Sequence, residues 1–106
     1  SVALNLVKDD YGMEIIDIKE VSRGNKMRYK RIKSRIIGRH GKTRVVIERL
    51  THCDISVYGK TVALIGEYDG LGVAFRGVEK LVQGSSHGSV YGYLEREMKK
   101  LNRKMR

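Results

Sequence analysis

Two glycines three residues apart, Gly38 and Gly41, constrain the fold of this chain more than any other feature of its sequence. An isoleucine pair precedes them, and the segments on both sides have helical periodicity. Glycine adopts backbone conformations that other residues avoid, and it lets a ligand approach the main chain closely. A helix that opens after Gly41 would present unpaired amides and the positive end of its dipole. We therefore predict two helices joined by a sharp turn that can hold an anion.

Basic residues are concentrated around this glycine turn. The 106-residue chain has a formal net charge of +10. Between residues 23 and 49 it has eleven Lys or Arg and a single acid, Glu48. Like charges four residues apart destabilise a helix by about 0.2–0.5 kcal/mol per pair, so this segment indicates an anionic partner. Nucleic acid is the first candidate, and an anionic membrane surface is the second.

Length and composition limit the number of domains and the cellular location of this chain. A chain of this length forms one domain with a modest core. No apolar run approaches the ~20 residues that span a bilayer, so we expect no membrane-spanning segment. Because nucleic acid is the first candidate for the basic surface, we expect no membrane partner. The single Cys53 cannot form a disulfide within the chain, which favours a reducing, cytoplasmic location.

Hydrophobic patterning predicts the remaining elements. Alternation predicts strands over 13–18, 54–58 and 61–66, with Gly59 and Lys60 as a two-residue hairpin connection. Helical spacing predicts helices over 26–37 and 42–50, a helix capped by Asp69 that ends at Gly84, and a C-terminal helix from about Val90. This order predicts an α+β fold, in which a three-stranded sheet carries helices on one face.

The glycine turn, its flanks and the element order together resemble a type I KH domain over residues 13–84. Ile47 also stands at an apolar position that is usual in the second helix of that family. The resemblance implies that the loop clamps about four nucleotides of single-stranded RNA or DNA. The nucleic-acid backbone would pass over the glycines while the bases lie in a narrow apolar groove.

Three stretches resemble more closely the second KH domain of an archaeal ribosome-assembly factor: residues 35–44 (RIIGRHGKTR), 57–63 (VYGKTVA) and 87–91 (HGSVY). That factor is the counterpart of the eukaryotic partner of the endonuclease that trims the 3′ end of small-subunit rRNA. The resemblance implies a non-catalytic role in small-subunit assembly and 3′-end maturation. It implies single-stranded rRNA near that 3′ end as the ligand, and the endonuclease and other assembly or initiation factors as protein partners.

Members of that family typically carry two KH domains, which determines how we divide this chain. We assign residues 1–12 to the tail of a connecting helix and residues 13–84 to the KH domain. Residues 85–106 form a basic C-terminal helix in this division.

The candidate RNA-binding residues lie in the glycine turn and on the neighbouring predicted strand. Gly38 and Gly41 would allow close approach, and nearby cations would contact phosphates. Arg44 stands where KH domains usually have an aliphatic residue, so we expect it to contact a phosphate or the paired acceptors of a guanine edge. The full candidate set is Lys33, Arg35, Ile36, Ile37, Gly38, Arg39, His40, Gly41, Lys42, Thr43, Arg44, Ile55, Val57 and Tyr58.

Other chemical interpretations fail on spacing. Residues 38–43 imitate the end of a phosphate-binding P-loop, but Ile36 stands where that motif needs its first glycine. His52 and Cys53 lack the ligand spacing of a zinc site. The serines before His87 lack an orienting acid and a nucleophile elbow. We therefore expect no catalytic residue, no metal and no cofactor.

Two alternative functions remain open from the sequence. One is a general KH module that binds mRNA or single-stranded DNA. The other is a protein-docking adaptor in a ribonucleoprotein, whose KH fold no longer holds RNA.

Overall fold

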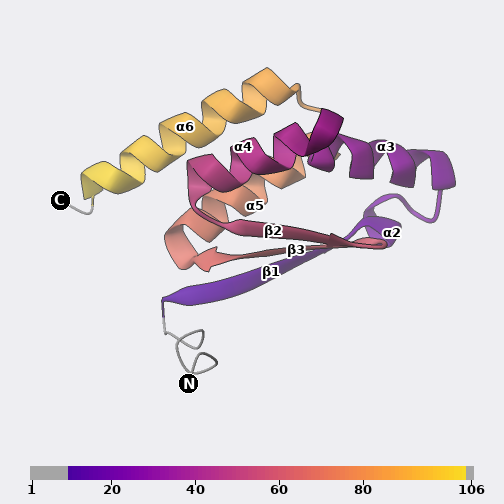
Figure 1. The fold of residues 1–106 in the computed structure, drawn as a ribbon, viewed down its shortest axis with the longest axis horizontal. Coiled ribbons are helices and arrows are strands. Elements are labelled where there is room, and N and C mark those ends of the chain that lie inside the picture. The colour runs from indigo at the N-terminus through magenta and orange to yellow at the C-terminus, as the bar shows by residue number, and fades with distance from the viewer. Residues whose placement is uncertain (1–9, 105–106) are drawn as a thin grey trace.

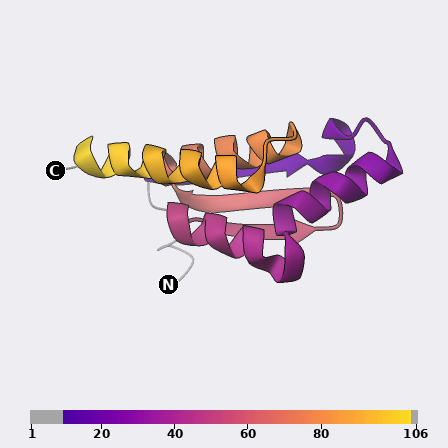
Figure 2. The same ribbon diagram turned by 90° about the horizontal axis from the view of Figure 1, so that it is seen from above.

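The computed structural model describes residues 10–104, which form a three-stranded antiparallel sheet covered on one face by helices (Figures 1 and 2). The strands lie in the order β1-β3-β2, so β3 is central and the other two are edges. The elements are β1 (Tyr11–Asp17), α2 (Ile18–Val21), α3 (Lys26–Ile37), the single turn η1 (Arg39–Gly41), α4 (Lys42–Thr51), β2 (Asp54–Tyr58), β3 (Thr61–Glu67), α5 (Tyr68–Val82) and α6 (His87–Lys104). The predicted α+β fold and element order are confirmed.

The N-terminal boundary of the sheet differs from the expectation. β1 begins before Met13, because Tyr11 and Gly12 pair with Glu67 and Gly66 of β3. It ends at Asp17, whose side chain accepts a hydrogen bond from the amide of Glu20 and so caps α2. A four-residue helix is too short to give a periodic signal, so the sequence did not predict α2. The helical tail expected over residues 1–12 lies, up to residue 9, outside the described residues.

The starts of the last two helices also differ. The expectation that Asp69 caps α5 is wrong, because α5 begins at Tyr68 and Asp69 lies in its first turn. α6 begins three residues before Val90, at His87. The side chain of Ser86 accepts a hydrogen bond from the amide of Ser89 and stabilises this first turn. Glycine and serine dominate the turn, and their composition is typical of a loop.

The core lies between the sheet and the helices and continues up to α6. The inner face of the sheet buries alternate residues, among them Ile55, Val62 and Leu64. Val90 and Leu94 of α6 are fully buried in the same cluster. Gly77 of α5 permits this contact, since a Cβ there would lie 2.7 Å from Leu94 Cδ2. α6 packs against α4 and α5 and is an integral layer of the fold (Figure 1).

We expect Leu94→Ala to lower the free energy of unfolding by about 2–5 kcal/mol, because it leaves a cavity between α5 and α6. Leu101→Ala, at a half-buried position near the end of the same helix, is the matched control and should cost less. Urea unfolding monitored by circular dichroism measures both. An equal loss of unfolding free energy in the two variants would contradict a core that extends to Leu94.

Candidate nucleic-acid interface

The turn between α3 and α4 depends on Gly38, which has no room for a side chain. Its φ of 78° and ψ of 172° lie in a region that is essentially restricted to glycine. A Cβ at this position would lie 2.6 Å from the backbone nitrogen of Thr43. The amide of Gly38 donates to the carbonyl of Ser34 at 2.7 Å and ends α3. Gly38 therefore brings the end of α3 directly against the start of α4.

The next residues form a tip that is held in left-handed backbone conformations. His40 has φ 56° and Gly41 has φ 74°. The amide of Gly41 donates to the carbonyl of Gly38 at 3.1 Å and closes the turn. A Cβ at Gly41 would meet no atom within 4 Å, so only its backbone conformation favours glycine there. The side chains of Arg39 and His40 are both exposed at this tip.

The structure brings four of the predicted residues together beside this tip. A shallow hollow on one side of the loop is lined by Lys33, Ser34, Ile37, Gly38 and Arg39. It combines two cations, glycine backbone and one half-exposed apolar side chain. Such a surface can contact both the phosphates and the bases of a single strand.

Three residues of the predicted set lie beneath this surface and belong to the core. Ile36 and Ile55 are fully buried, and Thr43 is almost so. Thr43 accepts a hydrogen bond from the hydroxyl of Tyr91, which reaches it from α6 at 3.3 Å. These residues support the loop from below and offer almost no surface of their own.

Arg44 contacts β2. Its Nη1 donates to the carbonyl of Ile55 at 3.1 Å, and the amide of Ile55 donates to Glu48 Oε2 at 2.8 Å. Two side chains one turn apart on α4 thus bind both backbone groups of one residue on an edge strand. By strand alternation, the amide and carbonyl of Val57 face the same edge. Val57 is half-exposed there.

Two other predicted residues are placed away from the groove side of the loop. Arg35 donates to the carbonyls of Leu81 and Ser85, and its Nε lies 3.0 Å from the first of these. Its guanidinium therefore binds the negative end of α5. Tyr58 is exposed, and alternation along β2 places it with Ser56 on the open face of the sheet, opposite the helices.

The cations around the loop have little internal compensation. In the part of the chain that the structure describes, the one ion pair joins Glu97 and Lys100, far along α6. Glu48 is occupied by the amide of Ile55. Unpaired cations on one face create a positive potential that attracts a polyanion.

A second hollow adjoins the glycine loop on the side of α6 and includes residues that sequence reasoning missed. Arg31 of α3 and the half-buried His87 and Tyr91 of α6 line it, together with residues of the loop. The stretch 87–91 was singled out only as part of a resemblance. Its position beside the loop could not be read from the sequence, because more than forty residues separate the two.

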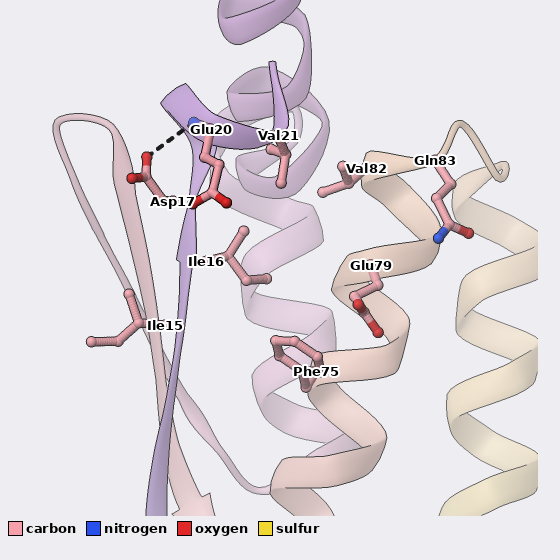
Figure 3. Close-up of a pocket in the computed structure, with 9 residues that line it drawn as sticks. All are labelled: Ile15, Ile16, Asp17, Glu20, Val21, Phe75, Glu79, Val82 and Gln83. Carbon is pink, nitrogen blue, oxygen red and sulfur yellow. Dashed lines mark hydrogen bonds between the residues drawn. The ribbon is translucent and has the colours of Figure 1, made fainter. Parts of the chain in front are cut away.

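The opposite side of the molecule has different chemistry. A hollow between β1, α2 and α5 has apolar walls, and its lining residues include three acids: Asp17, Glu20 and Glu79 (Figure 3). Carboxylates repel phosphates, so this surface is unsuited to a nucleic-acid backbone.

Burial raises the pKa of the Cys53 thiol, which keeps it protonated and weakly reactive. Among the described residues, no helix has the length and apolar character needed to cross a membrane.

A β1-β3-β2 sheet with a Gly-x-x-Gly turn between its first two long helices is the architecture of a type I KH domain. A model of that class, a eukaryotic-type KH domain represented by the second KH domain of PNO1, matches residues 12–99. The chain therefore belongs to this family of PNO1-type KH domains.

Curated relatives agree with this assignment. KH domain-containing protein MJ0443 of Methanocaldococcus jannaschii is 47% identical over 96% of this chain and 44% of its own length. The pre-rRNA-processing protein pno1 of Aspergillus fumigatus is 33% identical over 91% of this chain and 38% of its own length. This chain thus spans less than half the length of these two relatives.

Solved structures are also similar to this fold. The match to protein APE0754 of Aeropyrum pernix covers 97% of this chain and 55% of the APE0754 chain, with a TM-score of 0.90 and 37% identity. A crystal structure of an a/eIF2alpha-aDim2p-rRNA complex from Pyrococcus horikoshii contains a chain that matches 92% of this one and 52% of its own length. Its TM-score is 0.78 and its identity 43%.

We expect Gly38→Ala to destabilise the fold more than Gly41→Ala. The first adds a methyl group against the backbone of Thr43, whereas the second adds only left-handed strain of about 1–2 kcal/mol. Gly72→Ala is the control, because a Cβ at that helical position meets open space. This variant should raise the free energy of unfolding by about 0.5–1 kcal/mol. Urea unfolding ranks the three variants, and a Gly38→Ala variant as stable as the wild type would contradict the close contact.

Proposed function

We propose that this chain binds single-stranded RNA through the glycine loop and the hollow lined by Lys33, Ile37 and Arg39. The observation that carries the proposal is the loop itself, where Gly38 lets the start of α4 pack against the end of α3 and the missing side chain of Gly41 leaves backbone open to a ligand. Cations without acidic partners surround it, and RNA supplies the missing negative charge. KH domains bind single strands at such a loop.

Different residue types would contact different parts of the RNA. Arg39 and Lys42, both exposed, would contact phosphates as they pass the glycines. Ile37 and Val57 would pack against bases, and the backbone of Val57 would hydrogen-bond their edges. Arg44 uses one guanidinium nitrogen on Ile55, and its remaining donors would face the bound strand.

We further propose that the RNA is small-subunit rRNA near its 3′ end, and that the chain acts in subunit assembly and 3′-end maturation. Relatives named as pre-rRNA-processing proteins support this, as does the rRNA in the pyrococcal complex. That complex also contains a/eIF2alpha, which supports an initiation factor as a protein partner. The endonuclease that trims the 3′ end is a further proposed partner. No catalytic step is assigned to this chain.

We expect the double variant Arg39→Asp/His40→Asp to lose RNA binding and to keep its fold, because both side chains are exposed and outside the core. Arg49→Asp/His52→Asp is the matched control. It makes the same charge change at the far end of α4, and His52 shares the left-handed backbone of His40. Fluorescence anisotropy with a labelled RNA measures affinity. Full affinity in the folded first variant would overturn the proposal.

We expect the affinity to fall steeply with salt. If about four phosphates are neutralised, the slope of log K against log salt should be about −3 for a single strand. Titrations between low and physiological potassium chloride measure this slope. An affinity independent of salt would contradict phosphate binding.

The choice of nucleic acid needs a separate comparison. Single-stranded RNA with the small-subunit 3′-end sequence should bind more tightly than a scrambled RNA or a DNA of the same length. Equal binding of all three would favour a general KH module for mRNA or single-stranded DNA. No binding to any of them would favour a protein-docking adaptor.

A further inference from the structure

We propose a second nucleotide-binding subsite on the α6 side of the glycine loop, which takes the phosphate and base next to those bound at the loop. We call it the α6 hollow; Arg31, Arg39, Lys42, His87 and Tyr91 line it. This inference rests on the proposed RNA binding and extends it beyond the groove between the loop and β2.

The first argument is continuity. The hollow that contains Lys33 and Ile37 and the α6 hollow share three residues, Ser34, Gly38 and Arg39. The two hollows therefore adjoin at the glycine loop, and only the second one reaches α6. A strand whose backbone crosses Gly38 would leave the first hollow and enter the second without a gap.

The second argument is the chemistry of the lining. Arg31, Arg39 and Lys42 are exposed cations, and no carboxylate lines the α6 hollow. Two half-buried aromatic rings, those of His87 and Tyr91, complete it with their centroids 6.3 Å apart and a tilt of 46°. Cations for the phosphate beside aromatic faces for the base are the usual means of binding single strands.

The third argument is that the rings are held in place before any ligand arrives. His87 Nε2 donates to the carbonyl of Arg35 at 3.0 Å, and the hydroxyl of Tyr91 donates to Thr43 Oγ1 at 3.3 Å. The guanidinium of Arg35 is itself fixed on the carbonyls of Leu81 and Ser85. A preorganised surface loses less entropy when it binds.

A second cationic hollow at the other end of α3 is a weaker candidate. It contains Tyr29 with Lys26, Lys30 and Lys60, but it shares no residue with the glycine loop. The hydroxyl of Tyr29 donates to the carbonyl of Gly59 at 2.9 Å. The ammonium groups of Lys33 and Lys60 each lie 5.7 Å from the centre of its ring. Lys33 Nζ also donates to the Tyr29 hydroxyl at 3.4 Å, so this ring already has cations beside it.

The test compares RNAs of different length on the full chain. A four-nucleotide RNA is measured beside the same RNA extended by two nucleotides, at the 5′ end in one series and at the 3′ end in another. We expect one of the extensions to tighten binding about tenfold, as one stacked base and one further phosphate would. If neither extension tightens binding, the proposed subsite in the α6 hollow is overturned and the proposal for the glycine loop stands. If no RNA binds at all, both proposals are overturned.

Substitutions then test whether the gain in affinity of the extended RNA comes from the α6 hollow. Arg31→Glu and Tyr91→Leu should each remove most of the gain and leave the affinity for the short RNA within about twofold. Arg28→Glu, an equal charge change at an exposed position on the same helix, should keep the gain. Retention of the gain in Arg31→Glu, or its equal loss in Arg28→Glu, would overturn the proposal.

A further variant separates base stacking from a merely structural role of Tyr91. Tyr91→Phe keeps the ring and removes the hydrogen bond to Thr43. We expect it to retain the gain, because the face of the ring stacks on the base. If Tyr91→Phe loses the gain as completely as Tyr91→Leu, the hydroxyl acts by positioning Thr43 and the stacking subsite is refuted.

Discussion

The contact between Gly38 and Thr43 is the constraint on which the rest of this molecule depends. It sets how closely the end of α3 approaches the start of α4 and so fixes the position of the exposed tip between them. Thr43 is also the residue that α6 reaches through Tyr91. One buried threonine therefore links the glycine loop to a helix more than forty residues away in the chain. The loop is thereby part of the packed structure, even though its tip is exposed.

The fold was predictable where the signal is local. Strand alternation and the Gly59-Lys60 connection predicted the hairpin, and helical spacing predicted the four long helices. The sequence failed at short or atypical segments: α2 has only four residues, and α6 begins with residues typical of loops. Asp69 is a good capping residue by type, but the chain enters α5 earlier because β3 extends to Glu67.

The site was predictable in part, for a related reason. The glycines and the surrounding charge identify the loop from local sequence alone. The partners of Arg35 and Arg44 could not be predicted, because they are backbone carbonyls on distant elements. An arginine in a basic segment is an apparent phosphate ligand until the fold shows which carbonyls lie beside it. The same limit hid the position of His87 and Tyr91 near the loop.

Arg44 donates a hydrogen bond to the carbonyl of Ile55 and Glu48 accepts one from its amide, which has a consequence for the exposed edge of β2. β2 is an edge strand, and exposed strand edges invite pairing with other chains. Such pairing would join copies of a protein into aggregates. The two side chains of α4 occupy the edge at Ile55 and interrupt its regular row of donors and acceptors. A second copy of this chain therefore meets no continuous row of backbone donors and acceptors along β2 with which to extend the sheet.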